Sequence, residues 1–147
     1  MSDDLLDLPV DDALTTDLLD ERDPVAATRD GLTHDDLETV RSAIFGGTAQ
    51  TPAVTQELAR ALGVSARTLD RRKGGRLSPS ESDRLLLVAE TFDLAVRALD
   101  GEDRARAWLA RPHALLGGET PLARLDTLAG AREVRTVLQH IEYGMAA

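Results

Sequence analysis

Helix start signals, and not strand patterns, dominate this sequence. Four Ser or Thr residues stand directly before stretches in which apolar residues recur every three or four positions: Thr33, Thr51, Ser65 and Ser78. A hydroxyl in this position accepts a hydrogen bond from the first helical turn. Ser78 has the fullest signal, because Pro79 presets the first turn and Glu81 can return a hydrogen bond in a capping box. These signals predict helices over residues 34–45, 52–62, 66–73 and 79–99.

The C-terminal third continues the helical pattern after Asp100-Gly101. We expect a shorter helix over residues 102–110 and a last one from about 127 to 142. Between them lies a loop rich in helix breakers, with one helical turn over residues 120–125. No stretch keeps the apolar–polar alternation of a strand. The sequence therefore predicts an all-α fold without a sheet.

The negative charge of the chain, −9 in total, is confined to its first part. Residues 1–40 hold thirteen acids and two cations, whereas residues 41–147 hold thirteen acids and fifteen cations. We expect residues 1–30 to form an acidic, mostly disordered leader, because aspartate disfavours helix interiors. Its several leucines leave a short docking helix as the alternative. The remaining body is nearly neutral, so the net charge does not exclude nucleic-acid binding.

Several functional classes find no support in the sequence. Without cysteine there are no disulfides or thiolate sites, and no apolar run is long enough to cross a membrane. No secretory signal is present, and we expect a cytoplasmic protein. The three histidines stand apart, and no phosphate-binding loop or nucleophile motif occurs. We therefore expect no enzyme activity, no metal and no cofactor.

Residues 55–73, TQELARALGVSARTLDRRK, have the features of a helix-turn-helix. Ala59 is small enough for the second helix to cross the first, Gly63 permits a tight turn, and Leu69 supplies an apolar contact. We place this DNA-binding region at residues 31–77. The alternative is a helical hairpin used only for packing, but six cations between residues 66 and 85 favour DNA binding.

The second helix of such a motif presents its N-terminal residues to the major groove. Because arginine can bond guanine twice, the candidates for base contact are Ser65, Ala66, Arg67 and Arg71. The candidates for phosphate contact are Arg60, Arg72, Lys73 and Arg76. Arg72 stands where the usual motif has an apolar residue, so we expect the second helix to be anchored differently from that of typical repressors.

Longer motifs continue through the C-terminal half. The runs RTLDRRKGGRLSPSESDRLLLVAE and AWLARPHALLGGETPLARLDTLAGAREVRTVLQHIEYGMAA stand in order. With them, residues from about 35 to 147 resemble the Xre/MbcA/ParS-type antitoxins of type II toxin–antitoxin systems. The resemblance implies a helix-turn-helix that binds and represses the operon promoter. It also implies a C-terminal helical domain, here residues 78–147, that occludes the active site of a RES-domain, NAD-consuming toxin.

Carried onto this chain, the toxin-binding region of the family covers residues 108–112, 116–125 and 131–143. The residues that we expect to contact the toxin are Trp108, Pro112, Leu116, Gly117, Gly118, Pro121, Leu122, Arg132, Glu142, Tyr143 and Met145. Large side chains near the chain end are good interface anchors. The alternative is that the leucines of this region are core and the tail is frayed.

Two other functions remain open at this point. A stand-alone helix-turn-helix regulator would use its C-terminal helices for dimerisation, and an interaction module would have lost DNA binding altogether. We expect a homodimer within a larger toxin–antitoxin complex, because half-sites on DNA come in symmetric pairs.

Overall fold

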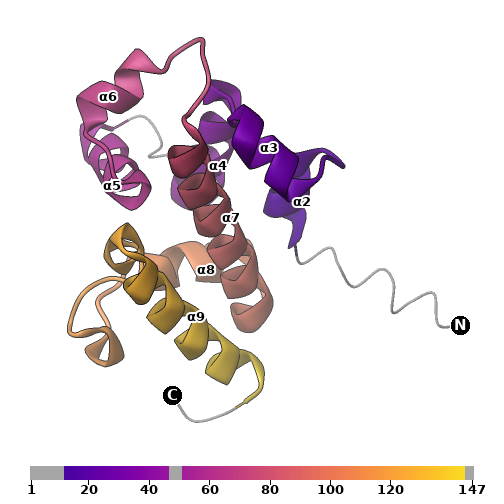
Figure 1. Ribbon diagram of the computed structural model, residues 1–147. Coiled ribbons are helices and arrows are strands. Elements are labelled where there is room, and N and C mark those ends of the chain that lie inside the picture. The colour runs from indigo at the N-terminus through magenta and orange to yellow at the C-terminus, as the bar shows by residue number, and fades with distance from the viewer. Residues whose placement is uncertain (1–11, 47–50, 145–147) are drawn as a thin grey trace, which may run out of the picture.

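The computed structural model describes residues 12–46 and 51–144, and no strand occurs among them. The predicted all-α fold is confirmed (Figure 1). The elements are α2 (Ala13–Leu19), α3 (Pro24–Asp30), α4 (His34–Phe45), α5 (Pro52–Leu62), α6 (Ala66–Arg71), α7 (Pro79–Leu99), α8 (Glu102–Leu109), η3 (Ala114–Leu116), η4 (Ala123–Asp126) and α9 (Leu128–Glu142). No helix in the described ranges is both long and apolar enough to cross a lipid bilayer.

Helix α7 is the central element, and the other helices pack around it. It contacts α2, α3, α4, α5, α8 and α9 (Figure 1). The predicted capping box is present: the Glu81 amide donates to Ser78 Oγ at 3.1 Å, and the Ser78 amide donates to Glu81 Oε1 at 2.8 Å. These bonds fix where α7 begins, and α7 in turn sets the positions of the elements on both sides.

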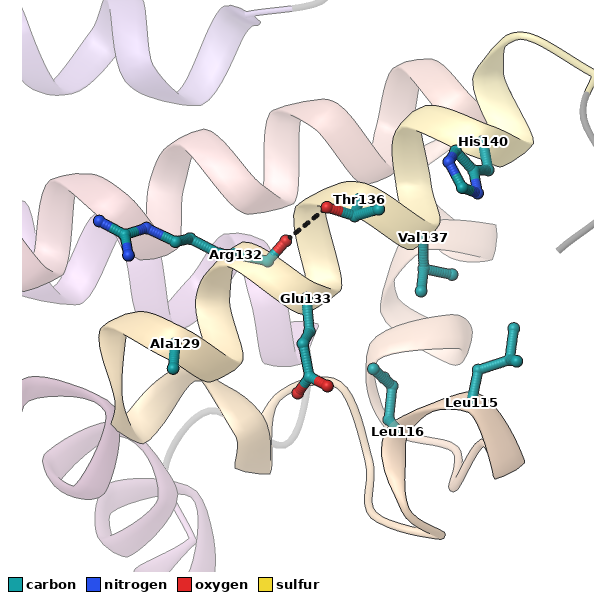
Figure 2. A pocket seen from close by; sticks show the side chains of 8 residues that line it. All are labelled: Leu115, Leu116, Ala129, Arg132, Glu133, Thr136, Val137 and His140. Atoms are coloured by element: carbon teal, nitrogen blue, oxygen red, sulfur yellow. Dashed lines mark hydrogen bonds between the residues drawn. The ribbon is translucent and has the colours of Figure 1, made fainter.

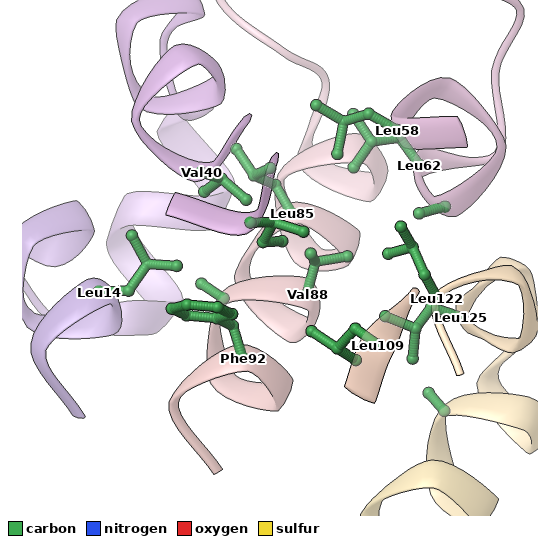
Figure 3. Packing of buried hydrophobic residues seen from close by; sticks show 14 of the residues in the cluster. Leu14, Val40, Leu58, Leu62, Leu85, Val88, Phe92, Leu109, Leu122 and Leu125 are labelled. Carbon is green, nitrogen blue, oxygen red and sulfur yellow. The ribbon is translucent and has the colours of Figure 1, made fainter. Parts of the chain in front are cut away.

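One apolar core runs through the whole described molecule. Figure 3 shows Leu58 and Leu62 of α5 close to Leu122 and Leu125 at η4, with Val88 of α7 beside them. The predicted boundary between residues 77 and 78 falls at the start of α7, whose apolar residues pack with elements on both sides of it. The helix-turn-helix and the C-terminal helices are therefore joined through buried side chains.

The N-terminal part differs from the sequence-based expectation. Residues 12–30 are not a disordered leader, because α2 and α3 both pack on α7. Leu14 and Leu18 of α2 are buried, and the carboxylate of Asp93 on α7 accepts bonds from the Leu14 amide at 3.1 Å and the Thr15 amide at 2.8 Å. Aspartate content argued against a helix, but a partner from another element supplies the missing cap. Residues 1–11 lie outside the described ranges.

A glycine allows the closest approach of the C-terminal elements. Gly130 lies in the first turn of α9, and a Cβ atom there would stand 1.9 Å from the carbonyl oxygen of Arg124 in η4. Thr127 caps the same turn, since its Oγ1 accepts from the Gly130 amide at 3.0 Å. Only glycine fits this crossing, which gives a packing reason for the Gly-Ala-Arg run that begins there.

Candidate DNA-binding and partner-binding surfaces

The helix-turn-helix geometry is formed by α5, a short turn and α6. Gly63 adopts a left-handed conformation with φ 78° and ψ 24°, and its amide donates to the carbonyl of Arg60 at 3.0 Å. Ala59 and Leu69 are each 2% exposed, so the small residue and the apolar contact occupy the interface between the helices. The physical requirements that the sequence suggested for these three positions are all met.

Helix α6 presents two arginines to solvent. Ser65 Oγ accepts from the Thr68 amide at 3.1 Å and so begins the helix. Arg67 and Arg71 are exposed on α6, whereas Ala66 is half-buried. The Arg67 side chain makes no hydrogen bond or ion pair with any described residue, and Arg71 has only a long contact of 3.5 Å to Thr68 Oγ1. The candidates for base contact therefore lie together, and Arg67 is free to bond another molecule.

The four candidates for phosphate contact are each held by a partner within the chain. Arg60 lies 3.6 Å from Asp126, Lys73 lies 3.4 Å from Asp70, and Arg76 donates to the carbonyl of Gly31 at 2.7 Å. These three cations remain exposed, and the two ion pairs, those of Arg60 and Lys73, can open to solvent or to phosphate at little cost.

Arg72 is held differently from the other three. Its Nε and Nη2 atoms donate to Oε1 and Oε2 of Glu81 at 3.1 and 3.0 Å, and Glu81 is 5% exposed. The hydrogen bond from Arg72 is the largest cause that lowers the pKa of the Glu81 carboxyl. The unusual arginine thus replaces the apolar contact of the common motif with an ion pair to α7, as the departure in the sequence suggested.

An open groove lies between η3 and α9 at the opposite end of the molecule. Its volume is about 450 Å³, and its lining residues are Leu115, Leu116, Ala129, Arg132, Glu133, Thr136, Val137 and His140. Figure 2 shows Val137 of α9 facing the two leucines of η3. Leu115 is 58% exposed although it is a large apolar residue. A solvent-open apolar floor with charged groups at its rim is typical of a site for a protein partner.

The loop before η4 is fixed in shape by polar contacts. Arg124 donates to Glu119 at 2.9 Å and also bonds Glu133 of α9. The His113 ring lies against Trp108, with 4.9 Å between ring centroids, and the His113 amide donates to the carbonyl of Glu119 at 3.0 Å. These contacts join the loop that borders the groove to α8 and α9.

The expected toxin contacts fall into three groups. Four of them are buried and so pack beneath the surface instead of contacting a partner directly: Trp108, Leu116, Pro121 and Leu122. Glu142 is half-buried and bonds Arg97 of α7, and Met145 lies outside the described residues. The exposed members of the set are Pro112, Gly117, Gly118, Arg132 and Tyr143. Of these, only Arg132 lines the groove, and its side chain has no polar partner among the described residues.

The ranges carried over from the family, 116–125 and 131–143, contain six of the eight groove residues, although only Leu116 and Arg132 were singled out as contacts. Leu115 and Ala129 lie outside those ranges and were missed. On α9 the groove residues recur at helical spacing along one stripe beside the buried Val134 and Leu138, so a helical register alone does not identify them as a surface for a partner. Among the described residues, no group of acidic or histidine side chains could hold a metal ion.

These features define a helix-turn-helix protein with an appended helical domain. Residues 55–90 match the family model described as the antitoxin Xre-like helix-turn-helix domain, and residues 94–144 match the antitoxin Xre/MbcA/ParS C-terminal toxin-binding domain. The first range covers α5, α6 and the first half of α7, and the second contains the groove. The chain belongs to the Xre/MbcA/ParS-type antitoxin family, as the sequence motifs predicted.

Two relatives carry the name antitoxin Xre. One, from Yersinia enterocolitica, is 35% identical over 92 residues, which are 60% of this chain and 62% of that protein. The other, from Photorhabdus laumondii, is 33% identical over 94 residues, which are 62% of this chain and 64% of that protein. The matched region thus spans somewhat less than two thirds of each relative.

Proposed function

We propose that this protein is an antitoxin that binds a toxin through its C-terminal domain and binds DNA through α6. The observation that carries the proposal is the pairing, on one body, of an exposed helix-turn-helix with an open apolar groove in the domain that matches the toxin-binding family model. The relatives named antitoxin Xre support the same conclusion. Neither surface requires the chain to catalyse a reaction.

The partner is a RES-domain toxin that consumes NAD, by the resemblance of the long C-terminal motifs. In this proposal the groove at η3 and α9 receives an apolar segment of the toxin, and Arg132 pairs with an acid beside it. The exposed loop glycines and Tyr143 then extend the contact over the toxin's active site. The Arg124 bonds to Glu119 and Glu133 connect this loop to α9 and so hold it beside the groove.

The test of toxin binding is co-expression with the product of the neighbouring gene. Growth should be arrested by that product alone and restored by this chain. Leu115→Asp should abolish rescue and binding in calorimetry, because it puts a charge on the apolar floor. Leu128→Asp is the matched control, since Leu128 is 52% exposed but lies beside α7 outside the groove. Equal loss in both variants, or no binding by the unaltered chain, would refute this role for the groove.

For DNA, we propose autorepression by a homodimer at the promoter of its own operon. Arg67 and Arg71 bond base edges, while Arg60, Lys73 and Arg76 lie near phosphates. The test is a mobility-shift titration with a duplex from upstream of the gene and with a random duplex of equal length. Preference for the upstream duplex, with one dimer bound per site, is the expected result. Equal affinity for the upstream duplex and the random duplex would refute sequence-specific repression.

A further inference from the structure

The second helix of the motif is too short to hold its own orientation. Helix α6 has six residues, and Leu69 is its only buried one. A helix of this length is not stable in isolation, so its direction depends on contacts with other elements. One such contact is the packing of Leu69 between α5 and α6. The position where the common motif supplies a second apolar contact is occupied by Arg72.

Arg72 stands at the C-cap of α6 and is joined to the first turn of α7. Both oxygens of Glu81 receive a guanidinium N–H, and Oε1 also accepts from the Ser78 amide at 2.8 Å. The Arg72 side chain is 34% exposed, whereas that of Glu81 is 7% exposed. A two-bond pair of this geometry fixes direction as well as distance. The C-terminal end of α6 is thus held against α7, the helix on which most of the other helices pack.

We infer that Glu81 is a positioning residue for the recognition helix and that Arg72 is its anchor, not a phosphate contact. The inference rests on the proposed binding of DNA by α6. Because the pair has two bonds and its carboxylate is buried, Arg72 stays bound to Glu81 and adds no counterion release when DNA binds, whereas the exposed pairs of Arg60 and Lys73 can open. Glu81 acts through Arg72 and does not touch DNA itself. Arg72 therefore leaves the set of phosphate contacts, and Arg60, Lys73 and Arg76 remain in it.

A double-mutant cycle on the full-length chain tests this assignment with the upstream duplex. Arg72→Gln and Glu81→Gln should each weaken binding about tenfold, and the double variant should be no weaker than either single variant. The slope of log affinity against log salt should stay unchanged in Arg72→Gln and in the double variant, because neither retains the Arg72 cation. If Arg72 contacts a phosphate, Arg72→Gln will reduce that slope by nearly one, and Glu81→Gln will strengthen binding by releasing the cation. That pattern would overturn the assignment.

Two matched variants separate positioning from bulk charge. Asp83→Asn removes an exposed acid from the same helix, two residues from Glu81, and should leave affinity equal to or slightly above that of the unaltered chain. Lys73→Gln removes the cation beside Arg72 and should reduce the salt slope by nearly one. A loss of affinity with Asp83→Asn as large as with Glu81→Gln would refute a specific role for Glu81.

Hydrogen exchange measured on the protein without DNA tests whether Arg72 and Glu81 hold α6 in place, independently of whether the protein binds DNA. In Arg72→Gln and Glu81→Gln, the amides of α6 should exchange faster, while those of α9 stay as slow as in the unaltered chain. Arg72→Lys keeps the charge but loses the second bond of the pair, so it should give an intermediate rate. Unchanged exchange in α6 would refute the anchor even if DNA binding is found. Failure of the unaltered chain to bind any duplex, with faster exchange in α6, would refute the proposed function but not the anchor.

Discussion

The two surfaces of this molecule are built in opposite ways. At the helix-turn-helix, five of six arginines and lysines around α6 already have a partner within the chain, and Arg67 stands out because it has none among the described residues. At the groove, polar groups hold the loop, Leu115 is exposed to solvent and Val137 is half-buried beside it. One surface is a set of cations, three of them paired with acids, beside an arginine without a partner, and the other is an exposed apolar floor. A count of cations or leucines in the sequence shows neither arrangement.

The largest effect is expected where the two regions share their core. Gly130→Ala should lower the free energy of unfolding by about 3 kcal/mol, because a methyl group 1.9 Å from the Arg124 carbonyl forces α9 and η4 apart. Element η4 also packs against α5, so both surfaces should lose stability together. Urea unfolding followed by Trp108 fluorescence and by circular dichroism should give one shared transition.

Gly75→Ala serves as the control for this substitution. A Cβ at Gly75 would meet its nearest neighbour, the carbonyl oxygen of Arg72, at an ordinary 3.6 Å. We expect a change within about 0.5 kcal/mol there. If Gly130→Ala stabilised the protein, as alanine does in an unobstructed helix, the close crossing of α9 and η4 would be disproved.

The second prediction is that a substitution on one surface affects binding of only one of the two ligands. Arg67 on α6 and Arg132 at the groove are exposed arginines whose side chains lack partners among the described residues. Arg67→Ala should cost about 2 kcal/mol in affinity for the upstream duplex and leave partner binding unchanged. Arg132→Ala should weaken partner binding and leave DNA affinity unchanged. Titration of each variant against both ligands checks this, and a variant that weakens both would show that the surfaces are not separate.

Much of the fold follows from local signals in the sequence. Capping residues predicted the starts of α4, α5, α6 and α7, because a side-chain acceptor one position before a helix is a local requirement. The turn at Gly63 and the small residue at Ala59 followed from the same kind of argument. The fold of residues 12–30 did not, because the cap of α2 comes from Asp93, 79 positions from Leu14. A local pattern contains no information about such a partner.

The candidate sites were predicted less completely than the fold. The position in the motif identified the exposed arginines Arg67 and Arg71. It could not show that Arg72 pairs with Glu81, because the sequence had assigned Glu81 only to the capping box of α7. In the C-terminal region, the family resemblance placed Leu116 and Leu122 among the toxin contacts, yet both are buried, and the alternative that the leucines of this region are core does not hold for Leu115, which is exposed. Leu115 and Leu116 lie in the same 3-10 turn, and which of them is buried depends on how that turn packs against the core, a tertiary contact that a local apolar run does not specify.

A third prediction compares two buried carboxylates of α7 by their response to acid. Burial raises the pKa of Asp93, whereas the bond from Arg72 lowers the pKa of Glu81. Ionised Asp93 therefore opposes folding above its raised pKa, and the cost is relieved as pH falls toward the ordinary carboxyl value. Ionised Glu81 stabilises the fold above the ordinary value, and this is lost as pH falls through its lowered pKa.

Unfolding in urea from about pH 7 to about pH 4 measures both effects. Asp93→Asn should cost about 1 kcal/mol at neutral pH, since the first amides of α2 lose an acceptor. The difference in free energy of unfolding between Asp93→Asn and the unaltered chain should grow as the pH falls. Protonation of Asp93 stabilises the unaltered chain, and the variant has no such group to protonate. The difference in free energy of unfolding between Glu81→Gln and the unaltered chain should shrink over the same titration. It should shrink only at the acid end, where the unaltered chain begins to lose the stabilisation from ionised Glu81. Deficits that change in the same direction would contradict the opposite environments of the two groups.

The smallest effect is expected at the contact between the two regions on the surface. Arg60 of α5 and Asp126 of η4 lie 3.6 Å apart, and their side chains are 59% and 41% exposed. Asp126→Asn should change the free energy of unfolding by less than about 0.5 kcal/mol, because solvent screens such a pair. It should nevertheless release Arg60 toward DNA and steepen the salt dependence of binding, by at most about one unit of slope. Arg60→Gln should flatten the same dependence with as little effect on stability. Identical slopes in both variants would mean that Arg60 does not reach DNA, and the phosphate contacts would then lie with Lys73 and Arg76 at the far end of α6.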